Sequence, residues 1–244
     1  MGFKRFRSYS GRRIKRQPVL LRRKYRRTRR MPRRMLRNRI PRRPYARMGM
    51  AVPEKFLTKL RYTQTSTIDA LPYNAAMGTN INVLRVNSIF DPDQTGTGHQ
   101  PLWRDQIALM YNRYRVHGMK YVLSVNGNKT RMTEIALVVA SNEAPEDKWS
   151  TACERKGTRI IQVPPGLSHT LTYTGFIRPG TPYGLTPRQM KADEAFFATM
   201  GLNPAKGTFM CIYVVTHDTT ARIDYDLHLT YYVELFDKVR VDGS

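Results

Sequence analysis

The first 50 residues contain no aspartate or glutamate, and the first acidic side chain of the protein is Glu54. This segment nevertheless holds 21 of the 42 Lys and Arg residues, so it carries +21 of the formal net charge of +24. Residues 51–244 carry the remaining +3. A segment with so much charge of one sign and few apolar residues repels itself, and we expect it to stay disordered until a polyanion neutralises it. The sequence therefore predicts two parts, a basic arm at 1–50 and a folded body at 51–244.

Cysteine is scarce, because the chain has only Cys153 and Cys211. Two cysteines at this separation make neither a disulfide framework nor a four-ligand zinc site, so we expect both to be reduced thiols. No apolar run approaches the length of a membrane span, and the first ten residues have no apolar signal region. We therefore expect no membrane insertion, and a protein made and kept on the cytosolic or nuclear side.

Motifs that would indicate catalysis are also missing, since no G-x-S-x-G, H-E-x-x-H or phosphate-cradling loop occurs. Asp91 and Asp93 imitate the start of a calcium loop, but its twelfth position is Leu102 where a bidentate glutamate is needed. We predict no catalytic residue, no cofactor and no metal site. One enzymatic alternative stays open: Asp226 and His228 share a face of one predicted strand and could do acid-base or metal chemistry.

The basic residues of the arm are grouped in clusters separated by prolines, which argues against one long helix. Arginine outnumbers lysine by 18 to 3, and its guanidinium matches phosphate with two parallel hydrogen bonds. Aromatic rings lie among these cations, as suits single-stranded nucleic acid whose bases stack on them. We predict binding that does not depend on base sequence, because the arm offers no rigid element to read base edges.

The residues predicted to bind nucleic acid are Arg5, Arg7, Arg12, Arg13, Lys15, Arg16, Arg22, Arg23, Lys24, Arg26, Arg27, Arg29, Arg30, Arg33, Arg34, Arg37, Arg39, Arg42, Arg43 and Arg47 in the arm, with Arg113 and Arg115 in the body. Two of the clusters also qualify as nuclear-import signals. The predicted import residues are Arg12, Arg13, Lys15, Arg16, Arg26, Arg27, Arg29 and Arg30.

The body reads as short runs of alternating apolar and polar residues separated by turn residues, a pattern typical of β-sandwiches and barrels. The predicted strands are 55–68, 80–90, 113–126, 132–140, 158–163, 168–175, 207–217 and 224–236. Eight strands with several long loops indicate an all-β fold, a single jelly roll of two packed antiparallel sheets. The periodicity does not determine the strand order.

Between these strands the sequence predicts a short helix at 103–112, a hairpin turn at 126–128 and a helical turn within 191–200. The run at 207–217 is apolar enough for a strand buried on both faces. In the strand 113–126, Arg113, Arg115 and His117 point to one side, which would suit a surface that faces nucleic acid.

Part of the chain resembles a known family. The residues Asn-Ser-Ile-Phe-Asp-Pro-Asp at 87–93, Gly-Thr-Gly-His-Gln-Pro at 96–101, Asp105 and Tyr-Asn-Arg-Tyr-Arg-Val-His-Gly-Met-Lys at 111–120 resemble capsid proteins of small circular single-stranded DNA viruses that encode a rolling-circle replication protein. Circoviruses are the best-known members. The arm, the chain length and the strand count are similar as well.

The resemblance implies a structural protein that assembles with itself into a small icosahedral shell, of 60 copies in the simplest case. It also implies a basic arm that contacts a single-stranded DNA genome inside the virion and reaches the host nucleus through import receptors, and outer loops that meet a host receptor. Two alternatives share the arm and its physics: a capsid protein of a small RNA virus, and a cellular basic-tailed nucleic-acid-binding protein.

Overall fold

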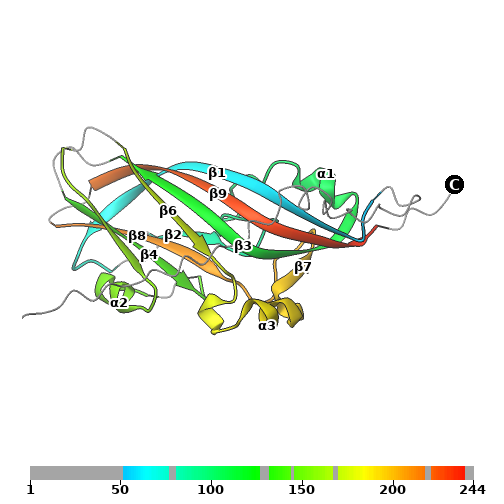
Figure 1. The fold of residues 1–244 in the computed structure, drawn as a ribbon. Helices are drawn as coiled ribbons and strands as arrows, with labels where there is room; N and C mark the ends of the chain where they lie inside the picture. The colour runs from blue at the N-terminus through cyan, green and yellow to red at the C-terminus, as the bar shows by residue number, and fades with distance from the viewer. Residues whose placement is uncertain are drawn as a thin grey trace, which may run out of the picture. The chain divides into compact units, whose positions relative to one another are not determined.

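A computed structural model describes residues 52–76, 81–126, 132–143, 146–166, 170–217 and 221–239 of the 244 residues. Within these ranges the chain is built from nine strands and five short helical segments. Two layers of strands face each other in Figure 1. None of the helices in the described ranges is both long and apolar enough to cross a membrane.

The first sheet holds the two longest strands, β1 (Lys55–Pro72) and β9 (Ala221–Lys238), which pair antiparallel along nearly their whole length. On the other side of β9 lies β3 (Tyr111–Val125), and beyond it β6 (Leu171–Ile177). The order is therefore β1-β9-β3-β6. A short strand, β7 (Phe197–Thr199), pairs with the beginning of β3.

The second sheet has the order β2-β8-β4-β5, and all of its pairs are antiparallel. Its strands are β2 (Ile81–Arg85), β8 (Phe209–Thr216), β4 (Thr133–Ala140) and β5 (Arg159–Val163). The end of β1 also pairs in parallel with the end of β8, which links the two sheets.

The strand pairs are nested along the chain, with β4 and β5 innermost, then β3 and β6, then β2 and β8, and β1 and β9 outermost. All four pairs are antiparallel, so the chain runs as one long hairpin rolled into two facing sheets. That arrangement is a jelly roll. The fold class predicted from the alternating pattern is confirmed, and the structure supplies the strand order that the pattern left open.

Five helical segments lie in the connections between strands: α1 (Arg104–Ala108), α2 (Trp149–Glu154), η2 (Thr181–Tyr183), α3 (Pro187–Ala192) and η3 (Glu194–Phe196). The best defined start is that of α3. A capping box forms there, because the Thr186 hydroxyl accepts the backbone N–H of Gln189 while the Gln189 side chain accepts from the Thr186 backbone.

The main core lies between the two sheets and is formed by the inward positions of each strand. In β1 these are the even-numbered residues, such as Leu60 and Tyr62, and in β9 the odd-numbered ones, such as Leu229 and Tyr231, as the alternation predicted. A second cluster covers the other face of β8, where α2 places Trp149 against the sheet. This helix explains why β8 is buried on both faces, as its sequence predicted.

Several elements differ from the prediction, among them the strand predicted at 80–90, which ends at Arg85. The turn predicted at 126–128 does not make a hairpin, because β3 belongs to the first sheet and β4 to the second, and residues 127–131 lie outside the described ranges. The helix predicted at 103–112 ends four residues earlier, since Tyr111 already pairs in the first sheet. The polar segment at 141–157 contains α2, which the sequence pattern did not predict.

Candidate nucleic-acid interface

The arm residues predicted to bind nucleic acid and import receptors, from Arg5 to Arg47, lie outside the described residues. The body candidates Arg113 and Arg115 are described, and both lie near the start of β3. The structure places them on the face of the first sheet that points away from the second sheet. We call this the outer face of the first sheet.

Basic side chains gather on the outer face because the strand period alternates them with core residues. In β1, Lys59 and Arg61 are exposed, whereas Leu60 between them is 3% exposed and belongs to the core. In β3, Lys120 is exposed between the buried Met119 and Tyr121. The alternation of side chains along β1 and β3 therefore places three cations on the outer face.

The strand register brings these cations into neighbouring rows. Arg61 pairs with Thr230 of β9, and Thr230 pairs in turn with Lys120 of β3. Lys120 is then opposite Phe176 of β6, so one row crosses all four strands. Directly paired positions are about 5 Å apart, so the backbone positions of Arg61 and Lys120, which are two strands apart, are separated by about 10 Å.

Two aromatic rings lie among the cations. Phe176 is 52% exposed, and its ring makes an edge contact with Tyr232 at a centroid distance of 5.7 Å. The Lys59 ammonium lies 5.2 Å from the Tyr232 ring centroid, and the Arg178 guanidinium lies 5.9 Å from that of Phe176. Rings beside cations offer a base a stacking surface and its phosphate a counter-charge. We call Lys59, Arg61, Lys120, Arg178, Phe176 and Tyr232 the basic-aromatic patch.

The four cations of the patch have no carboxylate within 4.0 Å among the described residues. On this face Asp224 and Asp226 lie toward the start of β9, and Glu234, which is nearer to the patch, is paired with other cations. The patch therefore keeps its positive charge available for an external anion.

A second group of cations on the same face surrounds Glu234 of β9, which is only 3% exposed. His117 lies 2.8 Å from its carboxylate, Arg115 at 3.6 Å, and Lys55 and Lys191 at 3.7 Å each. Burial alone would raise the pKa of Glu234, but the His117 hydrogen bond and the charges of Lys191 and Arg115 outweigh it, so the pKa is lowered. One carboxylate faces three permanent cations, and the group keeps an excess of positive charge.

The two predicted body residues have different surroundings. Arg113 is about half exposed, and its Nε lies 3.5 Å from the Asp237 carboxylate. Arg115 is 8% exposed, pairs with Glu234, and its guanidinium lies 4.6 Å from the Phe197 ring centroid. Burial lowers the pKa of Arg115, and Glu234 partly offsets that. Arg115 thus lies on the expected face, but its guanidinium is held by internal partners and not presented to a phosphate.

The alternative site at Asp226 and His228 is also on the outer face, with both residues bound to threonines of β1. Thr65 donates to Asp226 at 2.7 Å, and the Thr63 hydroxyl lies 3.2 Å from Nδ1 of His228. Within the described residues, no three His, Cys, Asp or Glu side chains are grouped so that they could hold a metal ion. A polar sheet face explains these contacts without catalysis.

Both cysteines of the body are free thiols. Cys211 is fully buried on β8, and burial raises its pKa to about 12. Burial also raises the pKa of Cys153, which is half-buried in α2. Neither thiol has the lowered pKa of a reactive cysteine.

Sequence reasoning missed most of the basic-aromatic patch, although part of its signal was visible. Lys59 and Arg61 stand on the polar side of the predicted strand 55–68, and only their partners were unknown. The pairing of Lys120 with Phe176 joins residues that are 56 positions apart, so it depends on the strand order. No periodicity within one strand could have indicated it.

No family model matches the chain, and neither does any curated protein. Among solved structures, the chain is similar to the decameric BFDV capsid protein at 12% identity and a TM-score of 0.41, over 74% of this chain and 99% of that one. It is similar to the semi-empty particle of the Macrobrachium rosenbergii nodavirus at 12% identity and a TM-score of 0.43, over 80% and 100% of the chains. It is also similar to the structure of turnip yellow mosaic virus at 10% identity and a TM-score of 0.42, over 78% of this chain and 99% of that one.

Proposed function

We propose that this protein is the subunit of a small icosahedral virus shell and that it packages a circular single-stranded DNA genome. The observation that carries the proposal is the combination of a jelly-roll body with an arm of 21 basic and no acidic residues. The body supplies a rigid unit that can tile with copies of itself, and the arm supplies the charge that condenses nucleic acid. The resemblance at 87–93, 96–101 and 111–120 adds support for single-stranded DNA as the cargo.

The total positive charge of the arms is of the size needed to neutralise a small genome. Sixty copies would bring about 1,260 positive charges from their arms, enough to neutralise on the order of a thousand nucleotides. Binding is driven by release of counterions and does not require the protein to read base sequence. A shell of 60 copies is the simplest closed arrangement and is the one we propose.

We further propose that the outer face of the first sheet is turned to the inside of the shell. The basic-aromatic patch would then meet the packaged strand after the arm has collected it. Its cations, which have no carboxylate partner in the described part of the chain, and its exposed Phe176 suit a flexible single strand, whose bases are free to stack. Arg113 would contribute a further charge, while Arg115 would hold Glu234 and with it the structure of the face.

Other parts of the proposal follow from a shell protein with such an arm. The arm clusters Arg12 to Arg16 and Arg26 to Arg30 would bind host import receptors and bring newly made subunits to the nucleus. The mature protein would reside in the virion, where exposed loops meet a host surface receptor. The role is structural, so we propose no catalytic residue and no cofactor.

The proposal is tested on the purified full-length protein by negative-stain electron microscopy, followed by sequencing of its nuclease-protected nucleic acid. We expect uniform closed particles that contain single-stranded DNA. A protein that stays monomeric in every buffer would overturn the shell and favour a cellular nucleic-acid-binding protein. Particles that hold only RNA would keep the shell but assign the protein to a small RNA virus.

A further inference from the structure

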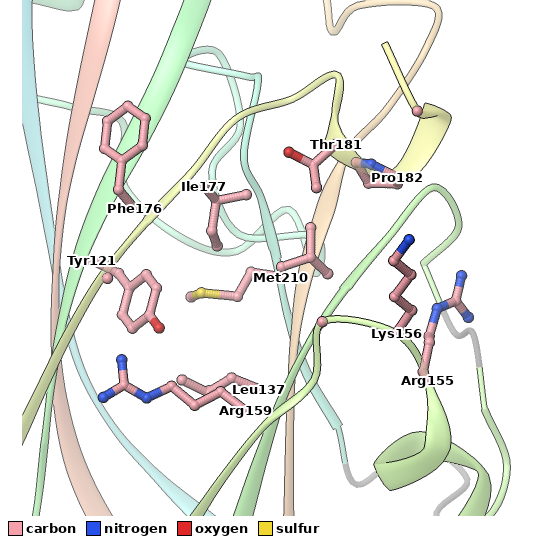
Figure 2. A pocket seen from close by; sticks show the side chains of 14 residues that line it. Tyr121, Leu137, Arg155, Lys156, Arg159, Phe176, Ile177, Thr181, Pro182 and Met210 are labelled. Carbon is pink, nitrogen blue, oxygen red and sulfur yellow. The ribbon is translucent and has the colours of Figure 1, made fainter. Parts of the chain in front are cut away.

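A cavity of about 810 Å³ opens between the two sheets at the edge formed by β5 and β6 (Figure 2). It is walled by β3 and β6 of the first sheet, by β4 and β8 of the second, by η2, and by the segment that leads from α2 into β5. Its volume lies in the range of binding sites for small organic molecules. The cavity is separate from the basic-aromatic patch, apart from Phe176 at its rim.

The inner wall of the cavity is apolar and rigid. Leu137 of β4, Ile177 of β6 and Met210 of β8 are 3%, 7% and 0% exposed, and each belongs to the main core. Met210 and Ile177 both point into the space in Figure 2. A wall built from core side chains of three strands favours the apolar part of a ligand and offers it almost no hydrogen-bonding group.

A polar group of the first sheet also lines the cavity, the hydroxyl of Tyr121 on β3. The residue is 6% exposed, yet its hydroxyl makes no hydrogen bond with any described residue, and Figure 2 shows it directed into the cavity. Its ring lies against Gly175 of β6, where a Cβ atom would overlap it. The hydroxyl borders the open space of the cavity and has no hydrogen-bond partner among the described residues, so it is free to donate to an acceptor on a ligand.

Three cations stand at the mouth of the cavity on the segment that leads from α2 to β5. Arg155 is paired with Glu146 at 2.9 Å. Arg159 reaches across the open edge and donates to the Thr174 carbonyl of β6 at 2.8 Å, one residue from the glycine that the Tyr121 ring covers. Lys156 is exposed and has no carboxylate within 4.0 Å among the residues that the structure describes. The mouth is therefore positive while the interior is apolar.

From this arrangement we infer that the cavity binds an amphiphile with a single anionic head group and an unbranched apolar tail, such as a fatty acid. The tail lies against Leu137, Ile177 and Met210, where it removes apolar surface from water. The head stays at the mouth near Lys156 and Arg159 and accepts a hydrogen bond from Tyr121. A nucleotide fits the same space less well, because the apolar wall has no groups to satisfy a base and a ribose.

The inference does not depend on the proposed shell function, since it rests on a cavity inside one subunit. It is tested on the full-length protein, stripped of bound lipid, by isothermal titration calorimetry with lauric acid and with uncharged dodecanol. We expect lauric acid to bind at one site per chain, and dodecanol to bind at least about fivefold more weakly because it lacks the charge. Equal affinity for the two probes would overturn the anionic head group.

The variant Tyr121→Phe removes only the hydroxyl, which has no hydrogen-bond partner within the described ranges, so the fold should keep its stability. Lauric acid should bind it about three- to tenfold more weakly, the loss expected for one hydrogen bond. The binding of dodecanol should change less. Unchanged affinity of Tyr121→Phe for lauric acid would show that the hydroxyl does not face the ligand and would overturn the site.

The variants Lys156→Glu and Lys148→Glu separate the cavity from non-specific attraction to the basic arm. Both residues are exposed and near α2, but only Lys156 lines the cavity. We expect Lys156→Glu to weaken lauric acid binding about five- to tenfold and Lys148→Glu to leave it unchanged. Equal effects of the two variants would mean that lauric acid is held by the overall charge of the protein, which contradicts the proposal.

Discussion

The ring of Phe176 on β6 lies over Gly118 on β3, in the space that a side chain at position 118 would occupy. A bulge between Val116 and Gly118 shifts the register of β3 against β9 at this point. Because residue 118 has no Cβ, the Phe176 ring reaches across β3 and contacts Tyr232 of the next strand. The contact between the two aromatic rings of the basic-aromatic patch therefore depends on the absence of a side chain at position 118.

The variant Gly118→Ala should displace Phe176 from Tyr232. The ring is half exposed and can turn outward, so the free energy of unfolding should fall only by the edge contact, about 0.5–1.5 kcal/mol. In a chain that lacks residues 1–47, the affinity for single-stranded DNA should fall several-fold, because a stacking surface is lost. Calorimetric unfolding and fluorescence anisotropy with a labelled oligonucleotide measure the two effects.

Gly201→Ala is the matched control, since no atom lies within 4 Å of a Cβ built on Gly201 and its φ is not positive. We expect this variant to keep both stability and DNA affinity. If the two alanine variants behave alike, the position of the Phe176 ring does not matter for binding.

The arm should supply most of the affinity for nucleic acid. If about ten phosphates are contacted, the logarithm of the binding constant of the full-length protein should fall with log salt at a slope near −7. Removing residues 1–47 should leave a folded body whose slope is near −3, as four patch cations imply. Salt titrations of both chains check this, and a body that keeps the full affinity would place the main binding site in the jelly roll.

The sequence correctly indicated those features of the fold that depend on the residues of a single strand. The alternation in β1 and β9 correctly indicated strands with two different faces, and the structure places one face of each, with Tyr62 and Tyr231, in the core. The apolar run of β8 likewise indicated burial on both faces. These features need no knowledge of which strands are neighbours.

The sequence did not predict, or predicted wrongly, those features that depend on contacts between segments far apart in the chain. The turn sequence at 126–128 favours a hairpin locally, but β3 is paired with β9 on one side and β6 on the other, and the next strand, β4, lies in the second sheet. Arg115 was predicted from its alternation alone to lie on a surface that faces nucleic acid, and the structure bears out only that it points away from the core residues Tyr114 and Val116. Its burial comes from Glu234 and Phe197, which are far away in the sequence and were not predictable from the strand.

Single charges of the patch should be detectable in the body without its arm. Lys120→Glu places a negative charge between Thr230 and Phe176, in the middle of the row that crosses the sheet. We expect weaker binding of single-stranded DNA at low salt and a salt slope that is less negative by about 1, because a phosphate contact is lost. Lys148→Glu, which makes the same charge change away from the patch, should have a much smaller effect. A similar loss for both variants would mean that only net charge matters.

Glu234 should hold the outer face together at neutral pH. Its carboxylate is nearly buried among Arg115, His117, Lys55 and Lys191, so Glu234→Gln leaves Arg115 without a counter-charge. We expect the free energy of unfolding at pH 7 to fall by roughly 2–3 kcal/mol. Glu194→Gln, at an exposed glutamate without an ion pair among the described residues, is the matched control and should be close to neutral.

The difference between wild type and Glu234→Gln should also depend on pH in a fixed direction. The pKa of Glu234 is lowered in the folded protein, so its carboxylate stabilises the fold fully above the ordinary pKa of a glutamate. That contribution is lost as the pH falls through the lowered pKa, because the folded state must then take up a proton as well. Urea unfolding should therefore show a difference that is largest near pH 7 and shrinks below about pH 4.5. A difference that stays constant down to pH 3, or that grows there, would mean that the cations around Glu234 do not stabilise its charged form.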